Sequence, residues 1–526
     1  MQNTELLLKE LTLEEKCALL SGAETFKTRG MPEHGIPQIW LSDGPHGLRK
    51  QAGESDHLGL NPSVPATCFP TASAVANSWD AALGEEIGAA LGEEAAAQEV
   101  SVVLGPGLNM KRNPLCGRSF EYFSEDPYLA GKLAAGYIRG IQSKGVAACP
   151  KHFAVNSQET RRMASDSIVD ERTLREIYLT GFEIAVKEGH PRSIMSSYNL
   201  VNGTYANENK HLLMEILRGE WGFDGAVITD WGGSNDHALG VKNGSTLEMP
   251  APGGDSVRFP FGYGMSYTTF AYSDMVADEQ GVSLTVTNTG SVAGTEIVQL
   301  YVAKKNSELF RPAKELKGFA RVTLAPGEKQ RITIMLDDKA FRFWNVKANR
   351  WEIEGGEYEL LVGASVEDIR LCEKISVHGT ATVHPYEDRD LDCYYKGDVL
   401  HVSDADFEKL LGHPIPKGKT KIDRNLTLGE LDHARSPLGW LVWLVLTILL
   451  DVSYKRGKPD LNILFQYNMP LRALAKMTNG AISMGMVDGI VMELQGFWIL
   501  GLVRVIYEAI KNVVLNAQME KRLRGA

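Results

Sequence analysis

Apolar and polar residues alternate in two different ways along the chain, and the pattern changes near residue 255. Before that position, short apolar runs typical of buried strands are separated by segments with helical spacing, such as Leu83, Ile87 and Leu91. The apolar runs lie at residues 39–41, 100–104, 146–149, 193–198 and 225–229. Strands that alternate with helices form parallel sheets covered by helices, so we expect a TIM-type β/α barrel over residues 1–255.

The second pattern is a strict alternation of apolar and polar residues between residues 259 and 379. Val282, Leu284 and Val286 illustrate it, and turn sequences at residues 288–290 and 355–356 separate the predicted strands. This pattern predicts a β-sandwich. Residues 380–425 are polar and mixed in composition, and we interpret them as a linker.

Residues 426–526 are helical in pattern and strongly apolar. The apolar run at 438–450 is shorter than the roughly 20 residues that a membrane span needs. A second stretch, 482–514, has apolar residues three or four apart, while Asp488, Glu493 and Arg504 mark a polar face. We expect a helical module that packs on itself and on a second copy of the chain, and contact with a membrane surface is the alternative.

Polar side chains collect where the predicted strands of the first part end. Asp230 and Trp231 follow one strand, and Asp43 and Arg49 follow another. An acid after a strand is often only a helix cap, but several polar residues at successive strand ends indicate a barrel active site. The same positions, together with the long loop at 105–127, supply five more candidates: Arg118, Lys151, His152, Met195 and Tyr198.

Composition and the N-terminal sequence bear on the partners, cofactors and localisation of the protein. The 526 residues carry a formal net charge of -11, which argues against a nucleic-acid partner because polyanion binding needs a basic surface. The six cysteines form no Cys-x-x-Cys pair, and no phosphate-binding loop is present, so we expect neither a metal nor an organic cofactor. The first residues lack the pattern of a secretory signal, and we therefore expect a cytoplasmic protein.

Five motifs in this order resemble those of the family 3 glycoside hydrolases, specifically the β-glucosidases. They lie at residues 43–49, 117–118, 151–156 with Arg161 and Arg162, 195–199 and 229–231. The resemblance covers 1–255 as the barrel and 259–379 as a fibronectin type III-like domain, which residues 259–268 open in the family's manner. It implies hydrolysis of terminal non-reducing β-D-glucosyl residues from a small β-glucoside or oligosaccharide.

The resemblance also implies a role for each candidate. Asp230 corresponds to the nucleophile of a retaining mechanism, in which a carboxylate attacks the anomeric carbon. Eight residues correspond to the substrate-binding set. Asp43, Arg118, Lys151 and His152 would hydrogen-bond the sugar, and Arg49, Met195, Tyr198 and Trp231 would line its subsite.

The chain departs from the family pattern in one respect. In the family a large α/β sandwich domain between the barrel and the fibronectin-like domain supplies the glutamate that acts as general acid and base. Here Glu248 is followed almost at once by Phe259, so that domain is absent, and Glu121, Glu125 and Glu248 are the candidate replacements. Either the chain is an internally deleted homologue, or a separate polypeptide completes the site. Two functions stay open: a retaining β-glucosidase, impaired by the loss, and a non-catalytic sugar-binding or oligomeric scaffold.

Overall fold

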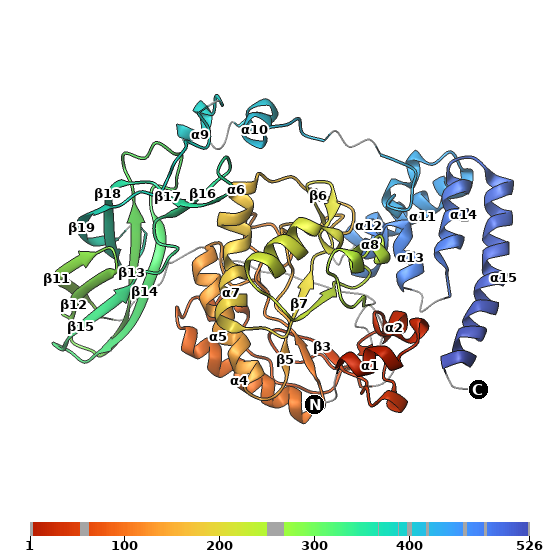
Figure 1. Cartoon of the computed structure of the whole chain (residues 1–526), viewed down its shortest axis with the longest axis horizontal. Coiled ribbons are helices and arrows are strands. Elements are labelled where there is room, and N and C mark those ends of the chain that lie inside the picture. The colour runs from red at the N-terminus through yellow and green to blue at the C-terminus, as the bar shows by residue number, and fades with distance from the viewer. Residues whose placement is uncertain are drawn as a thin grey trace.

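The computed structural model describes residues 4–52, 63–249, 268–366, 368–387, 389–396, 402–416, 420–455, 460–477 and 481–523. Figure 1 shows three parts: a central α/β domain, a β-sandwich on one side of it and a group of helices on the other. The connection between the sandwich and the helices passes over the α/β domain. The predicted junction at 255–259 and the motif at 259–267 lie outside the described residues.

The α/β domain contains the predicted parallel strands in two sheets. One sheet has the order β3 (Leu41–Asp43), β4 (Val102–Leu104), β5 (Ala147–Ala148), and the other pairs β7 (Ser193–Ser196) with β10 (Ala226–Thr229). Single bridges, Phe153 with Ser196 and Ile228 with Leu247, extend these sheets. Among the described residues the strands do not close into the predicted barrel, because they are short and the sheets meet through single bridges instead of continuous ladders.

Helices cover these strands in the predicted order. The helices are α1 (Thr4–Glu10), α2 (Leu13–Leu19), α3 (Ala72–Ala76), α4 (Ala81–Ala97), α5 (Pro127–Gln142), α6 (Glu171–Thr173), α7 (Thr180–Gly189) and α8 (His237–Lys242). Two π-helical segments, Leu174–Leu179 and His211–Glu220, occupy stretches where the sequence predicts ordinary helix. Short two-stranded or three-stranded additions are β1 (Gly22–Glu24), β2 (Lys27–Thr28), β6 (Asp166–Ser167), β8 (Leu200–Val201) and β9 (Thr204–Tyr205).

Glycines bring α4 and α5 into close contact beside the predicted apolar positions. Gly88 and Leu91 are buried on α4, and Leu83 and Ile87 are half-buried. A Cβ atom at Gly88 would lie 2.4 Å from the carbonyl oxygen of Tyr137, and one at Gly140 would lie 2.1 Å from that of Glu85. The two helix backbones therefore touch, which fixes the wall behind β4 and β5.

The β-sandwich has the strands that alternation predicts. One sheet has the order β11 (Phe270–Asp278), β12 (Gly281–Asn288), β15 (Lys329–Met335), and the other β14 (Glu315–Leu324), β13 (Gly294–Ala303), β18 (Gly356–Gly363), β19 (Ile369–Val377). Val282, Leu284 and Val286 lie in the core between them. A hairpin, β16 (Arg342–Asn345) with β17 (Arg350–Ile353), carries Arg342 to within 2.7 Å of Glu183 on the α/β domain.

The predicted linker contains two short helices, α9 (Asp392–Tyr395) and α10 (Asp404–Leu411). The tail that follows has five: α11 (Pro437–Lys455), α12 (Leu461–Asn468), α13 (Leu471–Met477), α14 (Met484–Leu494) and α15 (Trp498–Leu523). The apolar stretch at 482–514 is divided between α14 and α15 at Gly496, whose φ of 101° favours glycine. As expected, the helices pack on one another, through Leu431, Val487 and Leu494 among others.

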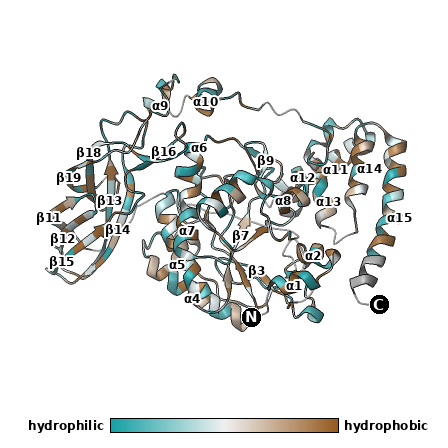
Figure 2. Ribbon diagram, in the orientation of Figure 1, coloured by the Kyte–Doolittle hydropathy of each residue, from teal (hydrophilic) through white to brown (hydrophobic). Residues whose placement is uncertain are grey.

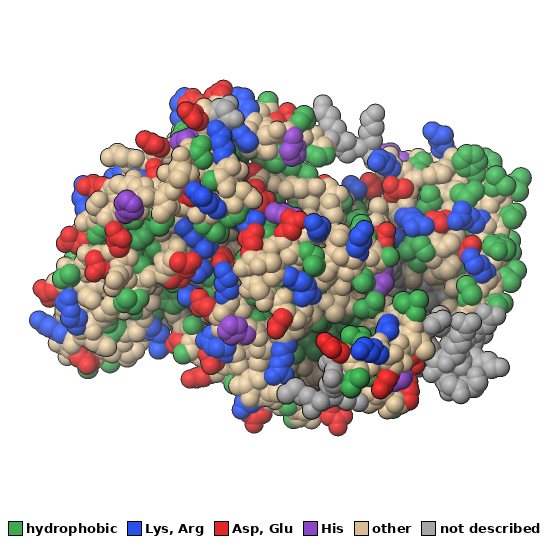
Figure 3. All heavy atoms as spheres, viewed as in Figure 1, with side chains coloured by type: hydrophobic (Ala, Val, Ile, Leu, Met, Phe, Trp, Pro, Cys, Tyr) green, Lys and Arg blue, Asp and Glu red, His purple; other side chains and the backbone are tan. Residues whose placement is uncertain are grey.

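The outer surface of the tail is apolar (Figures 2 and 3). On α15 the side chains of Ile499 and Val513 are 80% and 70% exposed. Among the described residues, α11 is the one helix whose 19 residues are long and apolar enough to cross a membrane. This helix extends beyond the predicted run and includes Asp451 and Lys455. A single helix of this kind also occurs in soluble proteins, so length and composition alone do not assign it to a membrane.

The contact between α4 and α5 predicts a difference between two glycine substitutions. Gly140→Ala should lower the melting temperature, because its methyl group would overlap Glu85 O and overpacking costs about 1–3 kcal/mol. Gly84→Ala is the matched control, since its nearest atom would lie at 3.4 Å and alanine favours helix by about 1 kcal/mol. Thermal unfolding followed by circular dichroism measures both. Equal melting temperatures would contradict the close backbone contact.

Candidate active site

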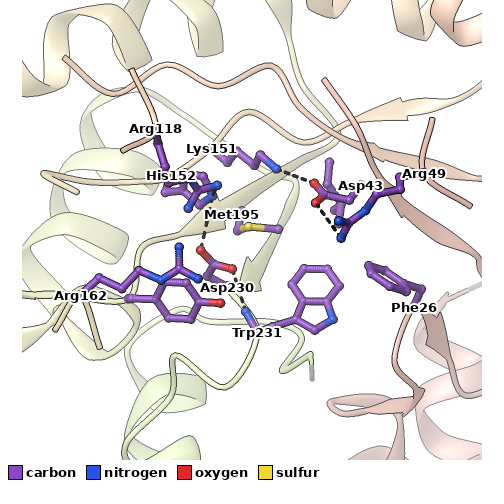
Figure 4. A pocket seen from close by; sticks show the side chains of 12 residues that line it. Phe26, Asp43, Arg49, Arg118, Lys151, His152, Arg162, Met195, Asp230 and Trp231 are labelled. Atoms are coloured by element: carbon purple, nitrogen blue, oxygen red, sulfur yellow. Dashed lines mark hydrogen bonds and ion pairs between the residues drawn. The ribbon is translucent and has the colours of Figure 1, made fainter. Parts of the chain in front are cut away.

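All nine predicted site residues line one pocket at the ends of the parallel strands (Figure 4). Asp43 ends β3, Met195 lies in β7, and Asp230 directly follows β10. The other six come from the segments after β3, β5, β7 and β10 and from the loop between β4 and α5: Arg49, Arg118, Lys151, His152, Tyr198 and Trp231. The structure thus brings the nine residues together, and their roles toward a sugar stay predictions.

Asp230 has two differently placed carboxylate oxygens. Oδ1 accepts a hydrogen bond from the backbone N–H of Trp231 at 2.9 Å. Oδ2 is buried and has no hydrogen-bond donor among the described residues; the ring Nε2 of His152 lies 3.3 Å from it. Burial raises the pKa of Asp230, and the positive charges of Arg118 and Arg162 act against that rise. The arrangement fixes one oxygen by a hydrogen bond and leaves the other without a donor among the described residues.

His152 is a neutral imidazole in this arrangement. Arg118 Nη2 lies 3.0 Å from its Nε2, and because a guanidinium can only donate, Nε2 must accept. The proton is then on Nδ1, which donates to the hydroxyl of Tyr122 at 3.2 Å. Burial, reinforced by Arg118 and Lys151, holds the pKa of His152 well below its usual value. The contact with Asp230 is therefore not a pairing of opposite charges.

Three buried charged residues, Lys151, Glu121 and Arg118, form a chain of ion pairs with the half-buried Asp43. Lys151 Nζ lies 2.7 Å from Asp43 Oδ1 and 3.1 Å from Glu121 Oε1, and Arg118 Nε donates to Glu121 Oε2 at 2.8 Å. Burial alone would raise the pKa of Asp43, but Lys151 and then Arg49 outweigh it and lower that pKa. Arg118 and Lys151 likewise overcome burial and hold the pKa of Glu121 well below normal. Both carboxyl groups are ionised and act as acceptors.

The apolar side of the pocket comes partly from the N-terminal segment. The rings of Phe26 and Trp231 are tilted by 45° with centroids 5.4 Å apart, and the indole N–H of Trp231 donates to Thr25 O at 2.7 Å. Phe26 follows no recognisable strand or motif, so sequence reasoning missed it. Arg162 also lines the pocket, with its guanidinium 4.6 Å from the ring centroid of Tyr198. Arg162 follows the motif at residues 151–156, and the sequence did not predict a role for it.

None of the candidate replacements for the acid/base residue lines the described pocket. Glu121 is ionised, as above, and Glu125 lies outside the lining. Glu248 pairs with His237 at 2.8 Å. Asp43 and Asp230 are therefore the acidic side chains among the described residues that line it.

One group of side chains in the described part of the chain has ligand atoms close enough for a metal ion. It consists of Glu15, Glu33 and His34, whose candidate atoms lie within 4.8 Å of one another. These residues are not part of the pocket lining. The expectation that the site uses neither a metal nor an organic cofactor stays a prediction.

Comparison with known proteins places the two larger domains. Residues 24–245 match the glycosyl hydrolase family 3 N-terminal domain, and residues 296–366 match the fibronectin type III-like domain. The crystal structure of a family 3 β-glucosidase from Bifidobacterium adolescentis superposes with a TM-score of 0.66 and 25% identity, covering 76% of this chain and 98% of that one.

Two relatives match in different ways. An exo-α-(1→6)-L-arabinopyranosidase from Bifidobacterium longum is 51% identical over 247 residues, which is 46% of this chain but only 32% of that enzyme. The thermostable β-glucosidase B of Acetivibrio thermocellus is 30% identical, and the match covers 72% of this chain and 88% of that protein. Because the second match spans nearly a whole relative and both domains agree, the chain belongs to glycoside hydrolase family 3 and is of the β-glucosidase type.

Proposed function

We propose that the chain is a retaining β-glucosidase-like hydrolase with Asp230 as its nucleophile. The observation that supports this most directly is that Asp230, whose Oδ2 has no donor among the described residues, lines a pocket with several hydrogen-bonding groups. In the first step Oδ2 bonds to the anomeric carbon while the bond to the leaving oxygen breaks. In the second step water attacks that carbon, releases the sugar and restores the carboxylate.

The lining residues match the surface of a pyranose. Lys151 and Arg118 can donate to sugar hydroxyls, and Asp43 can accept from them. Trp231 and Phe26 offer aromatic faces to the C–H side of the ring. We propose a terminal β-D-glucosyl residue as the substrate group. The arabinopyranosidase similarity supports testing an α-L-arabinopyranoside beside it, because that sugar is also a six-membered ring.

The described lining of this site lacks a group that could donate a proton to the leaving oxygen. A retaining mechanism needs two carboxyl groups about 5 to 5.5 Å apart, one of which donates a proton. Asp43 cannot donate it, because Lys151 keeps it ionised. The alignment with the A. thermocellus enzyme runs over 667 positions, more than the 526 residues of this chain, which supports the loss of a segment that carried the acid. We propose that activity is impaired for this reason.

The second candidate function is sugar binding without turnover. The lack of a proton donor among the described lining residues favours it, and the residues that would hold a sugar do not depend on that donor. The two candidates differ in whether an aryl glucoside is turned over, which the next two experiments measure.

Asp230→Asn should abolish glycosidase activity and leave the fold unchanged, because it removes the nucleophilic charge but keeps the shape. We expect a loss on the order of 10³-fold or more in kcat, the scale found when other enzymes lose their nucleophile. Asp224→Asn is the matched control, since Asp224 is exposed in the turn before the same strand. Wild-type turnover of nitrophenyl glucoside by Asp230→Asn would refute the assignment.

Activity should depend strongly on the leaving group. General acid catalysis contributes about 10²- to 10⁴-fold, so a nitrophenyl glucoside should react while cellobiose reacts barely or not at all. Azide should raise turnover when the second step limits the rate, and β-glucosyl azide should form, because azide needs no general base. Equal kcat/KM values for the two substrates would show that a proton donor is present.

We also propose that a second copy of the chain covers the apolar outer face of α11 and α15, since monomers rarely expose so large a patch. Full-length protein without detergent should sediment as a dimer, and a double substitution, Ile499→Glu with Val513→Glu, should shift it to monomer. Both side chains are exposed, so the fold should survive. A wild-type monomer would contradict this proposal, and recovery only from membranes would favour a lipid surface.

A further inference from the structure

Arg472, on α13 of the tail, is fully buried against the α/β domain. Its Nη1 donates to the carbonyl oxygens of Gly232 at 2.9 Å and Ser234 at 3.1 Å, and its Nη2 donates to that of Met163 at 2.8 Å. Its Nε donates to Asn425 Oδ1 at 2.8 Å. A buried guanidinium requires such partners, and here three of the four are main-chain groups of the α/β domain.

These three carbonyl groups belong to loops that also carry pocket residues. Gly232 directly follows Trp231, and Met163 directly follows Arg162, and both of these neighbours line the pocket. One cation from the tail therefore joins the loop after the proposed nucleophile to the loop on the other side of Asp230. Arginine suits this task because its donors have a fixed planar geometry.

The loop after Asp230 is held from its other side by an anion. The backbone N–H groups of Asn235 and Asp236 donate to Glu208 Oε1 at 2.7 and 2.5 Å, and Glu208 is itself buried. Arg472 binds the carbonyl groups of the loop and Glu208 binds its amides. Residues 232–236 thus lie between two opposite charges. The cation binds carbonyl groups of this segment, and the anion binds its amide groups.

Packing around Arg472 places the tail directly behind the pocket wall. Met469 and Ala473 form a buried cluster with Met163 and Tyr198, and Tyr198 lines the pocket. Farther along the same contact, Arg161 lies 2.7 Å from Glu430 of the tail. The tail is therefore packed on the α/β domain, a contact that the sequence did not predict.

We propose that Arg472 is a positioning residue, through which the helical tail holds the loops of the active site in their working geometry. Its effect on turnover depends on the proposed function, whereas its effect on the loops does not. Misplacing a reacting group by about 1 Å can cost on the order of 10²-fold in rate. Without Arg472 the buried carbonyl groups of Gly232 and Ser234 lose the guanidinium that donates to them, and Met163 O keeps only the hydroxyl of Tyr205. The loop that follows Asp230 is then free to shift.

Two substitutions in the full chain test this proposal, Arg472→Met and Arg472→Lys. Arg504→Met is the matched control, because Arg504 also belongs to the tail and pairs with Asp488 at 2.8 Å, but is 43% exposed. Nitrophenyl glucoside turnover is measured well below the melting temperature of each variant. Hydrogen exchange measured by mass spectrometry reports the amides of residues 232–236 independently of activity.

We expect Arg472→Met to lower kcat/KM about 10- to 100-fold and to speed exchange in residues 232–236. Arg472→Lys should fall between it and the wild type, since lysine can replace some but not all of the donors, and Arg504→Met should match the wild type in both measurements. Unchanged exchange, or unchanged kcat/KM with faster exchange, would overturn the positioning role. If Arg472→Met does not fold, Arg472→Lys decides by the same criteria. A wild-type chain without turnover would refute the proposed function, and exchange alone would then decide whether Arg472 holds the loops.

Discussion

The site depends on the mutual neutralisation of four charges, of which Lys151, Glu121 and Arg118 are buried and Asp43 is half-buried. A buried charge is costly unless an opposite charge and hydrogen bonds compensate it, and in this chain each cation meets a carboxylate at 2.7 to 3.1 Å. The four residues come from the end of β3, the loop after β4 and the segment after β5. The network therefore links the ends of three strands. It also keeps Asp43 and Glu121 ionised. Asp230 stands outside it, with one oxygen unpaired.

The proposed chemistry has two parts, sugar binding and protonation of the leaving oxygen. Residues that would hold a sugar are complete and rigidly partnered, as Lys151 shows with its 3% exposed side chain. The group that would protonate a leaving oxygen is missing from the described lining. In the proposed function, sugar binding and protonation of the leaving group therefore rest on different groups. A family 3 fold with such a pocket can retain recognition after losing much of its rate.

The sequence predicted most of what lies close to a strand end. Asp230, Lys151 and Asp43 could be assigned because each follows an apolar run, and parallel strands bring such positions to one edge. Phe26 and Arg472 could not be assigned, since their partners are far away in the sequence and no local pattern records a long-range contact. The described strands do not form the closed barrel that was predicted. The spacing of apolar residues indicates where strands lie, but it does not indicate how continuously they pair. The helices of the tail were foreseen, and their docking on the α/β domain was not.

The contact between Arg472 and Gly232 also has a consequence for synthesis on the ribosome. The two residues are 240 positions apart, and translation adds about 5–20 residues per second, so about 12–48 seconds separate their appearance. Throughout that interval the nascent α/β domain has its strands but lacks the cation that joins its two loops. A chaperone that binds the emerging chain during this time meets an α/β domain that still lacks Arg472.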